Sequence, residues 1–212
     1  MLLIGMFDSP FVRRVAITLK LLEQPFEHAN WSVGKDLERI RGHNPLGRVP
    51  TLVLTDGETL FESGAILDYL DELAGAERAL LPRAGVERRQ ALNLMAMATG
   101  AAEKGALQVY EGVFRPEAKR HQPWLDRLSS QMGMSLGAID RYVSERGVAK
   151  WLVGNRMTQA DITVACAFTY LNEALHVARD PVMFQSLSRF VARCEAMPVF
   201  AETRAPFSAP RN

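Results

Sequence analysis

The Asp56-Gly57 pair constrains the fold of this chain more than any other feature. It separates two short runs, Thr51–Leu54 and Thr59–Phe61, and Asp-Gly between apolar runs is the strongest short-range signal for a β-hairpin. Apolar residues at helical spacing begin directly after Glu62 and Ser63. The sequence therefore predicts a hairpin that places an acidic residue and a hydroxyl residue at the N-terminus of a helix, where anions are favoured.

The segment before this hairpin predicts a strand, a helix and a second strand. The apolar run Leu2–Met6 is typical of a strand covered on both faces. Ser9 and Pro10 form a helix start, with serine as the N-cap and proline in the first helical position. Gln24-Pro25 ends that helix, and Phe26–Asn30 is the second strand. This order indicates a right-handed parallel crossover, and a short charged helix then leads to the hairpin.

Beyond residue 85 the sequence carries almost no strand signal. Apolar residues recur at helical spacing in several segments, one ending at Arg115-Pro116 and the last running from about Val182 to Ala196. Glycine, proline and alanine concentrate just before the first of these segments. We therefore expect a small α/β domain over residues 1–76, a linker over residues 77–85 and an all-helical (all-α) domain over residues 86–212.

Charge and hydropathy exclude several classes of function. The formal net charge of +1 and the pI of about 7.8 give no electrostatic footprint for nucleic acid. We expect the densest basic groups, Arg13-Arg14 and Arg88-Arg89, to face solvent. No apolar run approaches the roughly 18 residues of a membrane span, and the N-terminus lacks the pattern of a signal peptide. We therefore expect a cytoplasmic protein with no membrane partner.

The cysteines and histidines predict neither a disulfide nor a metal site. Cys166 and Cys194 each lie inside a helical pattern, which favours buried free thiols in a reducing compartment over a disulfide. The four histidines show no metal-ligand spacing with one another or with the cysteines. We therefore expect no metal cofactor.

Ser9 has two interpretations. As a helix cap alone, it contributes about 1 kcal/mol to stability. In the functional interpretation, its hydroxyl also points into the open end of the helix, where a bound thiol would lie. Lowering a thiol pKa by about two units takes roughly 2.7 kcal/mol of preference for the thiolate. A hydrogen bond to a charged group contributes roughly 1.5–3 kcal/mol and a helix N-terminus roughly 0.3–1 kcal/mol, so no general base is needed.

The Val49-Pro50 and Glu62-Ser63 pairs are open to similar alternatives. Proline fits the first residue of an edge strand, and most X-Pro bonds are trans, so these residues alone do not predict a cis bond. With a cis bond, Val49 would present its backbone amide and carbonyl to an extended ligand. Glu62 and Ser63 are either a simple helix entry or a carboxylate beside free amide donors, which suits the ammonium and carboxylate of an α-amino acid.

Three segments, taken together and in this order, resemble a known family. They are Ser-Pro-Phe-Val-Arg-Arg-Val from residue 9, Asn-Pro-Leu-Gly-Arg-Val-Pro-Thr-Leu from residue 44 and Phe-Glu-Ser-Gly-Ala-Ile from residue 61. The chain resembles a soluble glutathione transferase of the serine type. The resemblance extends over the whole chain and implies a thioredoxin-like N-terminal domain of order β-α-β-α-β-β-α, followed by an all-helical C-terminal domain.

The resemblance implies a role for each matched residue. Ser9 would hydrogen-bond and stabilise the glutathione thiolate. Val49, before a Pro50 that is cis in the family, would pair its backbone with the cysteinyl part of the tripeptide. Glu62 and Ser63 would hold the ammonium and the carboxylate of the γ-glutamyl group.

Other positions extend or limit this resemblance. Phe11 joins the glutathione-binding set through the first motif, and Lys35 and Arg48 lie where some relatives place a basic residue near the glycyl carboxylate. Ser9-x-x-Val12 stands where a redox thioredoxin carries Cys-x-x-Cys, so thiol–disulfide exchange through a protein cysteine is disfavoured. No tyrosine lies near the N-terminus, which excludes a tyrosine-type activation.

Thr158-x-x-Asp161 matches the capping motif of the family's helical core. The residues by themselves form a capping-box pattern, with a hydroxyl N-cap and an acidic residue three positions later. We therefore assign this pair to structure and not to ligand binding.

The second substrate is expected between the two domains, against the long helix after the linker. Met97, Tyr110 and Phe114 are candidates for that wall, although aromatic residues at helical spacing are also typical of a helical core. We expect a hydrophobic electrophile as the reaction partner of glutathione. From the resemblance alone, we expect a homodimer.

The leading hypothesis is an enzyme of detoxification that conjugates glutathione, as co-substrate, to small electrophiles. Two alternatives stay open. The same thiolate would also serve isomerisation, dehalogenation or peroxide reduction, and the fold serves as a non-catalytic interaction module in transcription and translation proteins. Such modules often lose the activating hydroxyl or the acid–hydroxyl pair, whereas this chain retains Ser9, Glu62 and Ser63.

Overall fold

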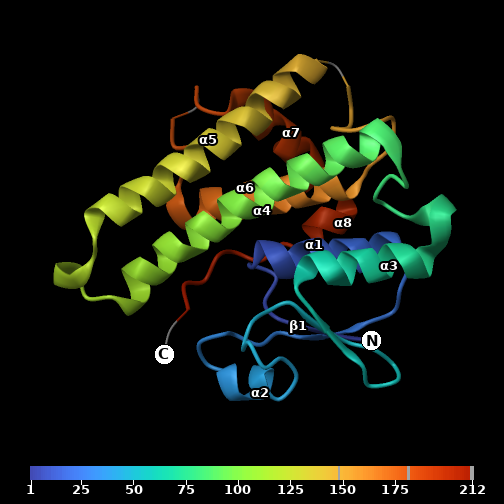
Figure 1. The fold of residues 1–212 in the computed structure, drawn as a ribbon, viewed down its shortest axis with the longest axis horizontal. Helices are drawn as coiled ribbons and strands as arrows, with labels where there is room; N and C mark the ends of the chain where they lie inside the picture. The colour runs from blue at the N-terminus through green and yellow to red at the C-terminus, as the bar shows by residue number, and fades with distance from the viewer. Residues whose placement is uncertain (148, 181, 211–212) are drawn as a thin grey trace.

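The computed structural model describes residues 1–147, 149–180 and 182–210. It contains a small mixed β-sheet flanked by helices, followed by an all-helical part (Figure 1). Figure 1 shows α1 and α3 between the sheet and the helical part, with α2 on the far side of the sheet. The predicted thioredoxin-like domain followed by an all-helical domain is therefore confirmed.

The sheet has the strand order β2-β1-β3-β4. Its strands are Leu2–Ile4 (β1), Glu27–Ala29 (β2), Thr51–Val53 (β3) and Thr59–Phe61 (β4). β1 and β2 are parallel, as predicted, whereas β3 is antiparallel to both β1 and β4. The hairpin predicted from Asp56-Gly57 is confirmed, and Gly57 has a φ of 92°, which glycine adopts without strain.

Helices α1 (Pro10–Leu21), α2 (Leu37–Arg41) and α3 (Ser63–Arg78) complete the N-terminal part. α1 begins at Pro10 with Ser9 as its N-cap, as the sequence predicts. The sheet and the two longer helices share one core, made by Leu3, Val12, Val15, Ala16, Leu19, Leu22, Leu52, Leu54, Ile66, Leu67 and Leu70. Full burial of one such aliphatic side chain contributes about 1.5–3 kcal/mol, so this core fixes the start of α1 relative to the hairpin.

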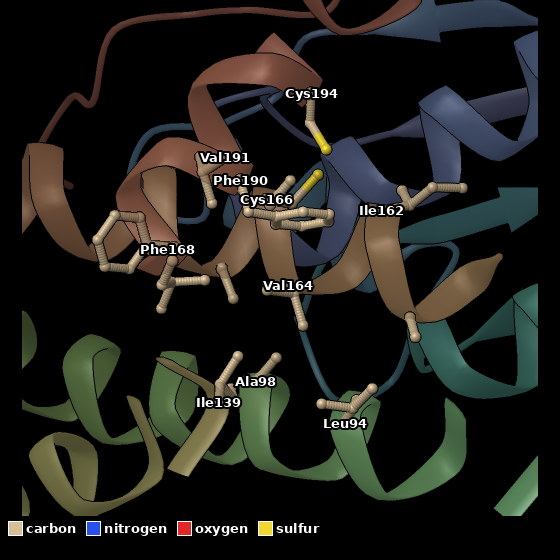
Figure 2. Packing of buried hydrophobic residues seen from close by; sticks show 14 of the residues in the cluster. Leu94, Ala98, Ile139, Ile162, Val164, Cys166, Phe168, Phe190, Val191 and Cys194 are labelled. Atoms are coloured by element: carbon tan, nitrogen blue, oxygen red, sulfur yellow. The ribbon is translucent and has the colours of Figure 1, made fainter. Parts of the chain in front are cut away.

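The helical part contains α4 (Gly85–Phe114), the 3-10 helix η1 (Glu117–Lys119), α5 (Gln122–Arg146), α6 (Gln159–Leu175), α7 (Gln185–Glu195) and α8 (Pro198–Ala201). α6 lies at its centre and is buried on nearly all sides (Figure 2). Gly105 of α4 sits against the Leu171 side chain of α6, where a Cβ atom would clash. Glycine at this position therefore allows close packing of the two helices.

Two predicted helix boundaries differ from the structure. The last predicted helix begins near Val182, but α7 begins only at Gln185, because Phe184 has a left-handed backbone with a φ of 53°. Pro198 ends α7 and also occupies the first turn of α8, a helix the sequence does not predict. α3 continues to Arg78 through a non-helical Gly75, and α4 begins at Gly85.

The two cysteines are free and buried, as predicted. In Figure 2 the sulfur atoms of Cys166 and Cys194 point toward one another within the helical core. Burial raises the pKa of each thiol to about 12, so both thiols stay protonated at neutral pH. These cysteines therefore supply no protein thiolate for chemistry.

The predicted capping box at the start of α6 is confirmed. The Thr158 hydroxyl accepts from the Ala160 backbone N–H at 3.3 Å, and the Thr158 backbone N–H donates to Asp161 Oδ2 at 2.8 Å. The other Asp161 carboxylate oxygen accepts from the Leu152 N–H at 2.8 Å. This buried cap joins the loop before α6 to the helix itself.

Helix α1 is attached to the helical part by a pair of buried arginines, which corrects the expectation that Arg13 and Arg14 face solvent. Their exposed fractions are only 4% and 5%. The Arg13 guanidinium donates to both carboxylate oxygens of Glu195 at 2.7 Å and to the Phe200 carbonyl at 2.8 Å. Helical periodicity alone missed this burial because α1 is covered by the sheet on one side and by α6 on the other.

Among the described residues, no helix is both long enough and apolar enough to span a membrane.

Candidate active site

A cleft of about 670 Å³ lies between the N-terminal part and the helical part. The N-terminal part contributes the segment around Ser9, the loop after β2 and the loop before β3. Facing side chains come from α4, from Tyr170 of α6 and from the C-terminal tail at Phe207, Ser208 and Pro210. Six of the predicted site residues line this cleft: Ser9, Phe11, Arg48, Val49, Tyr110 and Phe114.

Ser9 lies at the N-terminal end of α1 and lines the cleft. Its carbonyl accepts from the Arg13 N–H at 2.9 Å, as expected of an N-cap residue. Its side chain, however, makes no capping hydrogen bond, and the Ser9 hydroxyl has no hydrogen-bond partner among the described residues. The structure thus gives no support to the interpretation that Ser9 is only a cap.

Val49 lines the cleft next to Ser9, and the Val49–Pro50 peptide bond is cis, as the resemblance implies. No hydrogen bond to the Val49 backbone is found within the described residues. The loop reaches this position because Gly5, with a φ of 129°, ends β1 without a side chain: a Cβ there would lie 2.8 Å from the Val49 Cβ. Pro50 itself is buried behind the cleft surface.

Glu62 lies outside the lining of the cleft but forms an ion pair with the lining residue Arg48, with 3.3 Å between Glu62 Oε1 and Arg48 Nη1. Both side chains are more than half exposed, so this pair contributes about 0–1 kcal/mol and a charged ligand can displace it. Glu62 has a φ of 68°, in the left-handed region that non-glycine residues rarely adopt. Such strain concentrates at ligand sites.

Ser63 and Lys35 lie outside the lining of the cleft. Ser63 is the first residue of α3 and only 4% exposed, and its hydroxyl accepts from Arg14 Nη2 at 2.7 Å. Lys35 is exposed on the loop before α2. The structure therefore buries Ser63 against Arg14 and leaves Lys35 at the surface.

Tyr110 and Phe114 of α4 both line the cleft, and their rings lie 5.6 Å apart, one helical turn from each other. Burial raises the pKa of the Tyr110 hydroxyl, so it stays protonated at neutral pH. Met97 does not line the cleft. It packs against the helical core, and its carbonyl accepts from the Ser135 hydroxyl of α5 at 2.8 Å, because that face of α4 turns toward α5.

Sequence reasoning missed the wall made by the C-terminal tail. The Phe207 ring meets the Tyr170 ring edge to face, with centroids 5.6 Å apart, and the Ser208 N–H donates to Asp8 Oδ2 at 3.0 Å. Burial raises the pKa of the Asp8 carboxyl. The tail carries no periodic pattern, so nothing in the sequence signals that it borders the site.

The described residues contain no group of three or more His, Cys, Asp or Glu side chains placed to hold a metal ion. What the described residues offer at the cleft instead is the Ser9 hydroxyl without a protein partner, the unpaired backbone of Val49, the exposed Arg48 side chain and an aromatic wall. This set suits a small extended peptide with charged ends, beside an apolar group.

Comparisons with known proteins agree with this geometry. The family models for the glutathione S-transferase N-terminal and C-terminal domains match residues 3–78 and 102–198. The GST-like protein YibF of Escherichia coli (strain K12) is 34% identical over 172 residues, which cover 81% of this chain and 82% of that protein.

Two solved structures extend the comparison to three dimensions. A glutathione S-transferase from Methylobacterium radiotolerans in complex with glutathione sulfonate is 29% identical, with a TM-score of 0.90 and coverage of 100% of this chain and 97% of that one. A glutathione S-transferase from Methylobacillus flagellatus with bound glutathione is 26% identical, with a TM-score of 0.86 and coverage of 97% and 99%. By sequence and fold, this chain belongs to the glutathione S-transferase family.

Proposed function

We propose that the protein binds glutathione in the part of the cleft next to α1 and conjugates it, through its sulfur, to a hydrophobic electrophile. The observation that carries this proposal is Ser9, which lines the cleft at the N-terminal end of α1 and whose hydroxyl has no hydrogen-bond partner among the described residues. The glutathione complexes of the two similar transferases support the choice of ligand.

Ser9 acts on the thiol. Its hydroxyl donates to the glutathione sulfur, and the free N–H groups at the start of α1 add the positive end of the helix dipole. Together they supply roughly 2–4 kcal/mol of preference for the thiolate, enough to lower the thiol pKa from about 8.5 to near 6.5. The thiol proton leaves to solvent, the sulfur forms a bond to the electrophilic carbon, and the leaving group departs with its electron pair.

The remaining contacts hold the tripeptide in place. The backbone N–H and C=O of Val49 pair with the cysteinyl part, in the manner of an added strand. Glu62 binds the γ-glutamyl ammonium, and Ser63 with the N-terminus of α3 binds the γ-glutamyl carboxylate. Arg48, released from Glu62 when the ammonium arrives, and the exposed Lys35 are then available for the glycyl carboxylate.

The electrophile lies against Tyr110, Phe114 and the tail residue Phe207. This aromatic wall accommodates an apolar ring and holds it near the sulfur, which raises the effective concentration of the two reactants. The same thiolate would also carry out isomerisation, dehalogenation or peroxide reduction. A panel of electrophiles, a haloalkane and an organic hydroperoxide separates these reactions.

The test is an absorbance titration of the thiolate of bound glutathione, with calorimetric binding on the same sample. We expect saturable binding of glutathione and a thiolate signal that rises with a pKa about two units below that of free glutathione. Binding without a lowered pKa and without turnover on the panel would favour the non-catalytic interaction module. Absence of binding would overturn the proposal.

A homodimer in the cytoplasm completes the proposed function. In many relatives the N-terminal domain of one copy meets the helices of the other, and the resemblance extends to both domains of this chain. Light scattering after size-exclusion chromatography should give about twice the chain mass of 23.6 kDa. A mass near that of a single chain would contradict this part of the proposal.

A further inference from the structure

Arg14 is a buried cation that the proposed reaction does not yet use. Its neighbour Arg13 is neutralised by Glu195, with 2.7 Å between charged atoms. No carboxylate among the described residues forms an ion pair with Arg14, although its exposed fraction is only 5%. An isolated buried charge is costly, so its presence without a counter-ion calls for an explanation.

The contacts of Arg14 lead toward the start of α3. Its Nη2 donates to Ser63 Oγ at 2.7 Å, its Nη1 donates to Thr163 Oγ1 at 3.3 Å, and its Nε has no partner among the described residues. Burial lowers the pKa of Arg14 to about 10, so the guanidinium stays charged at neutral pH. The carboxylates of Glu62 and Glu103, which act on it without direct contact, favour the charged form.

The hydrogen bond from Arg14 decides how Ser63 can act. A serine hydroxyl has one hydrogen to donate and two lone pairs that accept. Because the guanidinium only donates, it occupies a lone pair of Ser63 Oγ, and the hydroxyl hydrogen must point to another acceptor. Ser63 is the first residue of the sixteen-residue helix α3, whose free N–H groups also favour an anion.

We propose that Arg14 is a positioning residue for the γ-glutamyl carboxylate of glutathione: it turns the Ser63 hydroxyl into a donor toward that carboxylate and takes the carboxylate as its missing counter-ion. This inference rests on the proposed function, because it assumes that glutathione is the ligand. It adds a second layer to the site, in which a buried charge acts through a single hydroxyl.

The test compares glutathione with its analogue 4-aminobutyryl-cysteinylglycine, which lacks only the γ-glutamyl α-carboxylate. Calorimetric titration of wild type and Arg14→Met should show about 10- to 100-fold weaker glutathione binding in the variant, the range of a hydrogen bond to a charged group. Affinity for the analogue should change by less than about threefold. Ser63→Ala should give the same selective loss, and Arg14→Met combined with Ser63→Ala should add little to either single change.

Thr163→Val is the matched control, because it removes the other hydroxyl partner of Arg14 and leaves Ser63 untouched. It should leave both affinities within about twofold of wild type. Arg14→Lys is the second variant if Arg14→Met does not melt cooperatively. Since it keeps the charge and loses the planar fork, it should show a smaller loss, about 3- to 10-fold, again for glutathione only.

The outcomes separate this inference from the proposed function. Equal losses for glutathione and for the analogue would show that Arg14 only supports the shape of the cleft, and would overturn the inference while the proposed function stands. Unchanged glutathione affinity in Arg14→Met would overturn it as well. If the wild type binds no glutathione, the proposed function fails first and the inference falls with it.

Discussion

Among the described residues, two helices have a hydroxyl residue as their N-cap, and the two hydroxyls have opposite surroundings. Thr158 at the start of α6 is 3% exposed and bonds to Ala160 and Asp161, so its helix end is satisfied within a few residues of the chain. Ser9 at the start of α1 makes no side-chain capping bond and lines a cleft of about 670 Å³.

The difference shows how a helix end without a side-chain cap is held in place. A capped end is held by its own loop, whereas the start of α1 depends on neighbours from far along the chain. One turn into α1, Arg13 is held by Glu195, and Arg14 by Ser63 and Thr163. The N-terminal part supplies the hydroxyl, and the helical part keeps it in position.

The largest expected effect concerns the ion pair between Arg13 of α1 and Glu195 of α7. Glu195→Gln should lower the free energy of unfolding by about 3 kcal/mol at pH 7, because it leaves the buried Arg13 without a charged partner. The matched control is Glu202→Gln. Glu202 is exposed, and its ion pair with Lys20 of α1 has the same 2.7 Å length. That change should cost less than about 1 kcal/mol, as measured by urea denaturation.

The pH dependence of the same pair has a defined sign. Burial opposes ionisation of Glu195, but hydrogen bonds from Arg13 and Thr169 outweigh it and lower the pKa of the carboxyl below its usual value of 4.5. Its stabilisation is therefore present above about pH 4.5 and is lost as pH falls through the lowered pKa. The stability difference between wild type and Glu195→Gln should shrink below pH 4.5. A constant difference down to pH 3 would contradict this assignment.

The second-largest expected effect concerns the Ser9 hydroxyl. Ser9→Ala should reduce turnover about 100-fold, the loss of roughly 2.7 kcal/mol of thiolate stabilisation, while glutathione affinity changes only a few fold. Because the Ser9 side chain makes no cap bond, the melting temperature should move by less than about 2 °C. Steady-state kinetics and thermal melting measure the two quantities. Full activity of Ser9→Ala on several electrophiles would show that Ser9 only begins the helix and has no role in catalysis.

Thr158→Ala is the mirror experiment at the capped helix. It should lower the free energy of unfolding by about 1 kcal/mol, because α6 loses the side-chain bond to Ala160. Turnover and glutathione affinity should stay at the wild-type level. A loss of activity with stability unchanged would remove the contrast between the two helix ends.

The smallest effect concerns the tail beside the open end. Phe207→Ala removes the edge-to-face contact with Tyr170, worth about 0.5–1.5 kcal/mol, and one wall of the proposed electrophile site. KM for an aromatic electrophile should rise about threefold, and glutathione affinity should stay the same. A change in glutathione affinity alone would place the tail next to the tripeptide instead.

Much of the fold was predictable because its signals are local. The Asp56-Gly57 hairpin, the Ser9-Pro10 helix start and the Thr158-Asp161 cap each depend on a few neighbouring residues with fixed geometric preferences. Local signals failed where a neighbour across space decides the outcome. Arg13 and Arg14 are buried by α6, and Met97 faces α5 and not the cleft.

The candidate site divides in the same way. The positions of Ser9, Val49, Tyr110 and Phe114 at one cleft agree with the sequence, since each lies at an end or on a face that the local pattern defines. The sequence did not predict that the C-terminal tail lines the cleft, because a segment without periodicity gives no sign of where it folds back.

By itself the sequence determined the order of the elements, the hairpin and the chemical groups available at each helix end. Only the tertiary structure decided which hydroxyl is satisfied and which is open, because that depends on atoms brought together from opposite ends of the chain. Hydrogen-bonding capacity belongs to the residue, whereas whether it is used depends on the partners that packing places within about 3 Å.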